Sequence, residues 1–133
     1  MTGITQPFNI LDCVDSTNNY AMGMVKTGYW GDKQAVFARE QTSGKGQRGK
    51  VWKSDKNANI LVSFIVDAQL IPIHQQFGLA VAAALSSTEL LRRHHLVSIK
   101  IKWPNDIYLG DRKAGGILIE TIVQGKKDRK SVV

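Results

Sequence analysis

The chain has 133 residues, 43% of them hydrophobic and 22% charged, which fits one folded domain over 1–133 and excludes a disordered chain. No apolar run approaches the ~20 residues of a membrane span, and the N-terminus lacks the basic and apolar regions of a signal peptide, so a cytoplasmic protein without membrane contact is expected. The net charge of +7 predicts an anionic ligand or partner.

The predicted elements follow in chain order. They are a strand over 8–14, a short helix ending near 26, strands over 34–40 and 59–66, a long helix over 73–94, a strand over 99–103, a hairpin that pairs 107–109 with 117–123, and the start of a strand at 131–133. Asp15 or Ser16 caps the first helix and Gly28 closes it, while Pro72 opens the second. Two helices with a mostly antiparallel or mixed sheet make an α+β fold.

Burial is predicted at two places and exposure at a third. Cys13 is expected to be a buried structural thiol, because no second cysteine exists for an internal disulfide and no cation lies beside it in sequence. One apolar face of the long helix is formed by Phe77, Val81, Ala84, Leu85, Thr88 and Leu91. A solvated turn after Gly125 is expected to hold the last cations, Lys126, Lys127, Arg129 and Lys130.

The segment 42–53, TSGKGQRGKVWK, combines three glycines with four cations in the pattern G-x-G-x-x-G. A dinucleotide fold needs a helix after the third glycine, but 50–58 is polar and turn-like. A kinase flap needs a lysine on the next strand and the H-R-D and D-F-G motifs, which the sequence lacks. Single-strand nucleic-acid binding around Trp52 stays open. Because glycines let backbone N–H groups approach closely, the segment favours a site for one or a few phosphates with a planar ring nearby.

A second cluster lies in the last third of the chain. It reads KWPND over 102–106 and KAGGILIE over 113–120. With D-S-T-N at 15–18, Gln41 and the glycine loop in this order, nearly the whole sequence resembles the catalytic domain of biotin protein ligases. The resemblance implies a biotin/lipoate ligase-like fold, similar to class II synthetases. The fold is expected to be incomplete, with no N-terminal DNA-binding domain and without the family's C-terminal β domain.

The resemblance also implies an activity, that of a biotin–[acetyl-CoA-carboxylase] ligase. Such an enzyme uses ATP to activate biotin as biotinyl-5′-AMP, and it transfers biotin to a lysine of a biotin carboxyl carrier protein. ATP and Mg²⁺ are then the cofactors, biotin is the substrate and the carrier is the partner, with no DNA bound and homodimerisation left open. Because the sequence stops where a strand begins, a fragment is expected, and its own activity stays open.

Roles for individual residues follow from the same resemblance. Lys113 is the expected catalytic cation, together with Arg48. Contacts to biotin are expected from Ser16, Thr17, Gln41, Gly44, Lys45, Lys113, Gly115 and Gly116. Contacts to ATP or the adenylate are expected from Lys45, Gly46, Arg48, Gly49, Lys50, Trp52, Lys102 and Asn105. Asp106 is the candidate magnesium ligand.

Several alternatives stay open beside these roles. Ser16 and Thr17 can cap a helix, Trp52 can be a core aromatic, and 104–106 can be a turn. Gln47 stands where the family usually has arginine, so it receives no role. The alternative functions are a lipoate ligase or acyltransferase of the same fold and a non-catalytic basic nucleic-acid-binding domain. The polar set of Ser16, Thr17 and Gln41 favours a ureido ligand over a dithiolane.

Overall fold

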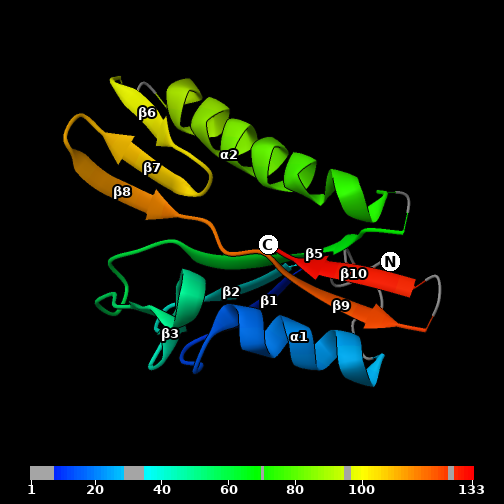
Figure 1. The fold of residues 1–133 in the computed structure, drawn as a ribbon. Helices are drawn as coiled ribbons and strands as arrows, with labels where there is room; N and C mark the ends of the chain where they lie inside the picture. The colour runs from blue at the N-terminus through cyan, green and yellow to red at the C-terminus, as the bar shows by residue number, and fades with distance from the viewer. Residues whose placement is uncertain (1–7, 29–34, 70, 95–96, 126–127) are drawn as a thin grey trace, which may run out of the picture. The chain divides into compact units, whose positions relative to one another are not determined.

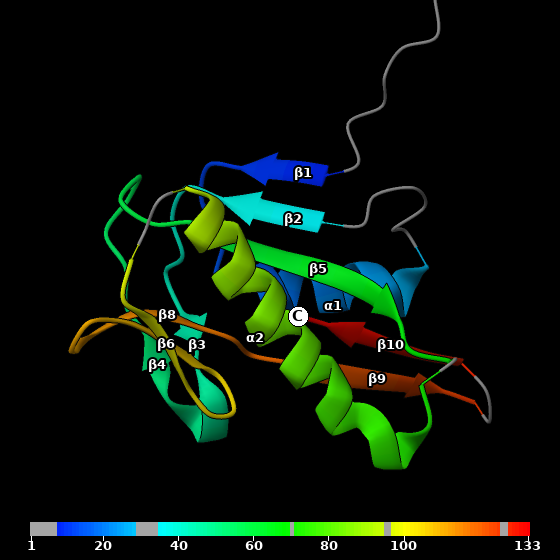
Figure 2. The same cartoon turned by 90° about the horizontal axis from the view of Figure 1, so that it is seen from above.

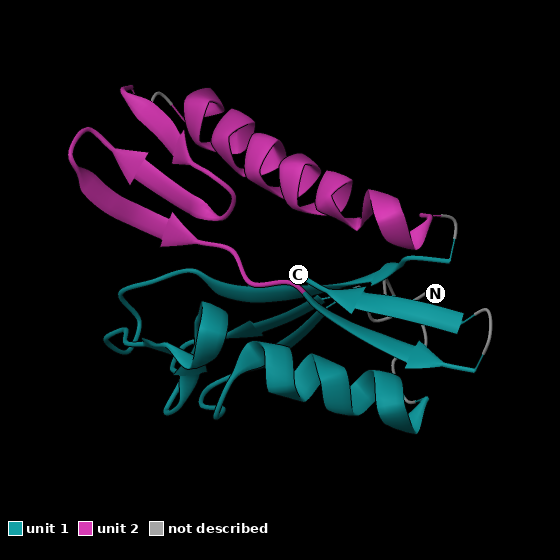
Figure 3. Cartoon of the chain, viewed as in Figure 1, with its two compact units in different colours: residues 1–69, 120–133 teal, residues 70–119 magenta. Residues whose placement is uncertain are grey.

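A computed structural model describes residues 8–28, 35–69, 71–94, 97–125 and 128–133. The chain forms two compact units, which Figure 3 shows in different colours. Unit 1 comprises residues 1–69 and 120–133, and unit 2 comprises residues 70–119. The chain therefore leaves unit 1 once and returns to it at Glu120.

Unit 1 is built on a five-stranded sheet. In spatial order its strands are β1 (Phe8–Leu11), β2 (Ala35–Ala38), β5 (Leu61–Asp67), β10 (Asp128–Val132) and β9 (Glu120–Gln124). Figure 2 shows these five strands side by side in that order. The β1–β2 pair is parallel and the other three pairs are antiparallel, so the predicted mixed, mostly antiparallel sheet is confirmed.

Helix α1 (Thr17–Thr27) covers one face of this sheet, as Figure 1 shows. Ser16 is its N-cap, and its Oγ accepts a hydrogen bond from the N–H of Asn19 at 3.3 Å. The helix ends at Gly28, where φ is 70° and the N–H donates to the carbonyls of Met24 and Val25. Both predicted ends are confirmed. They could be predicted because each depends on a local signal in the sequence.

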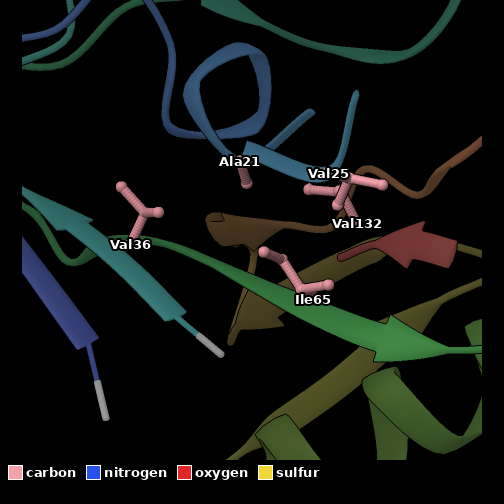
Figure 4. Close-up of a cluster of buried hydrophobic side chains, with 5 residues drawn as sticks. All are labelled: Ala21, Val25, Val36, Ile65 and Val132. Carbon is pink, nitrogen blue, oxygen red and sulfur yellow. The ribbon is translucent and has the colours of Figure 1, made fainter. Parts of the chain in front are cut away.

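The core of unit 1 lies between α1 and the sheet. Ala21 and Val25 of α1 meet Val36 of β2, Ile65 of β5 and Val132 of β10, and Figure 4 shows these five side chains. The strand register places Val132 opposite Ile65, so both side chains point to the face that α1 covers. Burial of this apolar cluster fixes the helix on the sheet.

Gly23 occupies an α1 position where a side chain has room, because an added Cβ would meet no heavy atom within 4 Å. Glycine costs a helix roughly 0.5–1 kcal/mol relative to alanine. We expect Gly23→Ala to raise the free energy of unfolding by about that amount. Urea denaturation of the variant and of the parent chain measures it, and a lower free energy of unfolding for the variant would contradict the expectation.

Unit 2 contains one long helix and a three-stranded antiparallel sheet. A short 3₁₀ turn η2 (Ile73–Gln75) leads into α2 (Gln76–Arg93), and the strands are β6 (Ile99–Lys102), β7 (Asp106–Leu109) and β8 (Arg112–Gly116). Helix α2 packs against β6 and β7. Ala84 and Thr88 of α2 are buried, but the predicted apolar face is wrong at Phe77 and Leu85, which are 64% and 52% exposed.

The second hairpin differs from its prediction. Residues 112–116, not 117–123, pair with β7, and Glu120–Gln124 joins the sheet of unit 1 as β9. The cause is a tight turn: Gly110, with φ of 60°, reverses the chain at once, so pairing resumes with Arg112 opposite Leu109. The β6–β7 turn contains a cis peptide bond between Trp103 and Pro104.

The prediction that Cys13 is buried is wrong, because the thiol side chain is exposed. The first strand ends at Leu11, three residues earlier than expected, and Cys13 lies in the irregular segment that follows. Outside a paired strand the alternation of inward and outward side chains no longer applies, so the apolar character of the run does not bury this residue.

The expected solvated turn at the end of the chain is wrong for Lys130. This lysine is buried in β10, and its Nζ lies 2.5 Å from Asp128 Oδ1 and 3.5 Å from Asp67 Oδ2. The Asp128 carboxylate raises the pKa of Lys130, and Lys130 lowers the pKa of Asp128. Arg129 donates from Nη2 to the carbonyl of Ala68 at 3.3 Å. Lys126 and Lys127 lie outside the described residues.

Candidate functional site

The glycine-rich segment forms a small hairpin in unit 1. Strand β3 (Gly44–Lys45) pairs with β4 (Val51–Trp52), and the turn η1 (Gln47–Gly49) joins them. The N–H of Gly46 donates to the carbonyl of Lys50 at 2.7 Å, which closes the loop. Arg48 and Gly49 both have positive φ, 56° and 76°. No helix follows the third glycine, which agrees with the exclusion of a dinucleotide fold.

Gly44 marks the closest approach of backbone in this hairpin. A Cβ at this position would lie 2.4 Å from the carbonyl oxygen of Trp52 and 2.9 Å from Nε2 of Gln41. The first of these atoms belongs to the paired strand and cannot move aside as a flexible side chain can. Glycine is therefore required here by the protein's own packing, independently of any ligand.

A buried polar cluster lies beside the hairpin, at the start of α1. Thr17 donates from both its N–H and its Oγ1 to Oε1 of Gln41, at 2.8 and 3.0 Å. Ser63 of β5 places its Oγ 2.8 Å from Thr17 Oγ1 and 2.5 Å from Asn18 Oδ1. Thr17 is 5% exposed, Asn18 7% and Ser63 1%. Buried polar groups satisfied in this way hold each other in fixed orientations.

Charged groups continue this network toward the loop. Lys45 Nζ lies 2.6 Å from Glu120 Oε1 and donates to Asn19 Oδ1 at 3.1 Å, while Asn18 Nδ2 donates to Glu120 Oε2 at 3.1 Å. Asn19 Nδ2 also donates to Asp15 Oδ2 at 2.9 Å, and this hydrogen bond is the main reason that the pKa of Asp15 is lowered. The cation at the start of the loop is thus tied to α1 and to β9.

In unit 2, charged side chains share one face of the three-stranded sheet. Lys113 Nζ lies 2.8 Å from Asp106 Oδ1, and the two side chains are 40% and 21% exposed. Lys102, opposite Asp106, places its Nζ 5.9 Å from the centre of the Tyr108 ring. Ile107, on the other face of the same strand, is buried. A cation over an aromatic ring and an ion pair therefore lie on the face opposite Ile107.

A β-bulge brings Lys113 to this face. Gly115 pairs with Ile107, but Tyr108 pairs with Lys113, so Ala114 is an extra residue in β8. In regular pairing Lys113 would lie opposite Leu109, on the face of Ile107. The extra residue shifts Lys113 by one position and places it on the face of Asp106 and Tyr108, which is a known use of bulges to re-aim a side chain.

The predicted site residues thus fall into two groups, each described within its own unit. Unit 1 holds Ser16, Thr17, Gln41, Gly44, Lys45, Gly46, Arg48, Gly49, Lys50 and Trp52. Unit 2 holds Lys102, Asn105, Asp106, Lys113, Gly115 and Gly116. Capping by Ser16 is confirmed, since its Oγ accepts from the first turn of α1. The Asn105 carbonyl accepts from the N–H of Ile117 at 2.8 Å and so holds the turn at 104–106.

Sequence reasoning missed four members of these networks: Asn18, Asn19, Ser63 and Glu120. Asn18 and Glu120 were part of the quoted motifs but received no role, and Ser63 stands in an apolar strand as one polar inward residue. A serine that alternates with Leu61 and Ile65 on the buried side of a strand was the available signal.

The described residues can be compared with the ligands that a magnesium site needs. Within the described ranges, no group of three or more His, Cys, Asp or Glu side chains gathers as a metal site. Asp106 can offer a carboxylate oxygen, but it already pairs with Lys113. A single carboxylate is enough for a Mg²⁺ ion that is held mainly by the phosphates of a nucleotide, which is a common way for proteins to bind this ion.

None of the helices in the described part of the chain is both long enough and apolar enough to cross a membrane.

Comparison with known proteins gives consistent matches. A sequence model described as "Biotin/lipoate A/B protein ligase family" matches residues 10–133. The bifunctional ligase/repressor BirA of Escherichia coli is 36% identical over 111 residues, which cover 84% of this chain and 34% of that protein. The chain thus spans about a third of this curated relative's length.

Two solved structures are similar over most of the chain. The biotin acetyl coenzyme A carboxylase synthetase of Helicobacter pylori, with bound biotinylated ATP, has a TM-score of 0.63 and 27% identity, and the match covers 94% of this chain and 58% of that one. The biotin protein ligase of Leishmania major, in complex with biotinyl-5-AMP, has a TM-score of 0.64 and 28% identity, and covers 94% and 55%.

Proposed function

The chain belongs to the biotin/lipoate A/B protein ligase family, and from this we propose that it carries biotin- and ATP-binding residues of a biotin protein ligase. The whole protein activates biotin with ATP and transfers it to a lysine of a biotin carboxyl carrier protein of a biotin-dependent carboxylase. The observation that carries the proposal is the buried Thr17–Gln41–Ser63 network beside the glycine hairpin, in a chain similar to two ligases with biotinyl ligands. We place the reaction in the cytoplasm.

The first step joins two anions. A carboxylate oxygen of biotin attacks the α-phosphorus of ATP, the bond to the bridging oxygen breaks, and pyrophosphate leaves with the electron pair. Negative charge on the carboxylate and the triphosphate must be neutralised before they can meet, and fixed cations do this best in a site from which water is excluded. In the second step the lysine amine of the carrier attacks the acyl carbon of the anhydride, and AMP leaves.

Lys113 is the cation that we assign to the α-phosphate and the biotin carboxylate, together with Arg48 of the loop. Asp106 holds the Lys113 ammonium at 2.8 Å, which orients it. Lys102 and Asn105 are assigned to the ATP phosphates. Bound magnesium would neutralise phosphate charge, and Asp106 would be its protein ligand.

The loop residues are assigned to the adenylate. Gly46 and Gly49 carry no side chain and so let the loop backbone come close to a phosphate, Lys50 adds charge, and Trp52 offers an aromatic ring to the adenine. Ser16, Thr17 and Gln41, with Gly44 and Lys45 of the loop, are assigned to biotin. The ureido group of biotin has two N–H donors and one carbonyl acceptor, which suits side chains that can both donate and accept. Gly115 and Gly116 are also assigned to biotin. A Cβ on Gly115 would lie 3.8 Å from Cβ of Ile107, an ordinary contact, so the packing of the protein itself does not require glycine at this position.

Isothermal calorimetry on the 133-residue chain separates the candidate functions. We expect heat from biotin, and from a non-hydrolysable biotinyl-AMP analogue, but none from lipoate. Binding of lipoate without biotin would move the chain to the lipoate branch of the family. Steep salt-dependent affinity for DNA, with no response to biotin or ATP, would instead support the nucleic-acid-binding alternative.

A further inference from the structure

We propose that Glu120 is a positioning residue for the reaction, and that it acts by holding the Lys45 ammonium in place for the bound anion. The inference rests on the proposed function and adds a residue to it. Glu120 lies at the start of β9, where the chain re-enters unit 1, and Lys45 lies in the glycine hairpin, 75 residues earlier in the sequence.

The contacts around Lys45 fix the position of its ammonium group. Two of the three N–H groups of its ammonium are engaged, by Glu120 Oε1 at 2.6 Å and by Asn19 Oδ1 at 3.1 Å. Within the described part of the chain no third acceptor meets it, and the side chain is 39% exposed. One N–H group is therefore available for an oxyanion, a carboxylate or a phosphate, without loss of the other two hydrogen bonds.

Glu120 is itself fixed on its second oxygen. Oε2 accepts from Asn18 Nδ2, and Asn18 Oδ1 lies 2.5 Å from the Ser63 hydroxyl, which also contacts Thr17. Thr17 and Gln41, which are assigned to biotin, are thus joined to Lys45 by one chain of hydrogen bonds through Ser63, Asn18 and Glu120. Because lysine has a flexible stem with four rotatable bonds, an ammonium without these partners would sample many positions.

A double-mutant cycle on the rate of adenylate formation tests this, with Glu120→Gln and Lys45→Met alone and together, at saturating biotin and ATP. Glutamine keeps an acceptor for Asn18 but removes the charge that holds Lys45. We expect Glu120→Gln to lower the maximal rate roughly tenfold, as expected for a misplaced catalytic group. In the Lys45→Met background the same change should have no further effect, because nothing is left for Glu120 to position.

Two results would overturn the proposal: Glu120→Gln at the wild-type rate, or Glu120→Gln slowing the reaction by the same factor in both backgrounds, which is the behaviour of a purely structural residue. If Glu120→Gln does not fold, Glu120→Asp replaces it in the same cycle, since it shortens the arm by one methylene and keeps the charge. Glu89→Gln is the matched control, because it breaks an exposed ion pair with Arg93 in α2. A wild-type chain that forms no adenylate and binds neither biotin nor the biotinyl-AMP analogue contradicts the proposed function itself, so the two failures differ.

Discussion

Replacing Lys113 by methionine is expected to lower the rate of adenylate formation about 10²- to 10³-fold, the cost of removing one fixed group that stabilises transition-state charge. Lys113 is placed by a β-bulge on the same face as Asp106, which holds it at 2.8 Å. Methionine keeps an apolar, unbranched stem like that of lysine but not the charge. Single-turnover formation of biotinyl-AMP, at saturating biotin and ATP, measures the effect.

Arg112→Met is the matched control, since it also removes one cation from β8. Arg112 pairs with Leu109, on the other face of the strand from Lys113, and no role is assigned to it. The control should form adenylate at close to the wild-type rate. Equal losses for the two variants would show that the total charge of the hairpin matters rather than the position of Lys113. An unchanged rate for Lys113→Met would show that Lys113 takes no part in the reaction.

Gly44→Ala is expected to open the glycine hairpin. The new Cβ would lie 2.4 Å from the carbonyl oxygen of Trp52, so the β3–β4 pair must separate. Overpacking of this kind costs roughly 1–3 kcal/mol. We expect the free energy of unfolding to fall by about this amount. The affinity for biotin should also fall by about tenfold, which is about 1.4 kcal/mol of binding free energy, because the separated hairpin no longer holds Gly44 and Lys45 in place.

Gly23→Ala provides the control for this substitution, because it adds the same methyl group in open space on α1. It should leave the affinity for biotin unchanged. Calorimetric titration of biotin and urea denaturation of both variants give the two quantities. Wild-type affinity in Gly44→Ala would mean that the hairpin does not contribute to the biotin site.

Local signals allowed the sequence to predict much of the fold. The ends of α1 follow from Ser16 and Gly28, which act on neighbouring backbone groups and need no knowledge of the rest of the chain. The motif order led to the family, which the match over residues 10–133 confirms. The roles of the individual site residues remain predictions.

What the sequence did not predict depends on partners far apart in the chain. Lys130 is buried because Asp67, on a neighbouring strand, faces it across the sheet. Glu120 meets Lys45 for the same kind of reason. The register of the second hairpin depended on a bulge of one residue, which no periodicity of hydrophobic side chains reveals. Such pairings become visible only when the sheet is assembled.

The central claim is that this chain binds biotin and ATP for adenylation. The most direct measurement mixes the purified 133-residue chain with labelled biotin, ATP and magnesium, and follows both biotinyl-5′-AMP and pyrophosphate. The account predicts that the two products appear in equal amounts, that Lys113→Met abolishes most of both, and that lipoate does not replace biotin. Formation of an adenylate with lipoate but not with biotin, or no adenylate and no binding of biotin or of the biotinyl-AMP analogue, would contradict it.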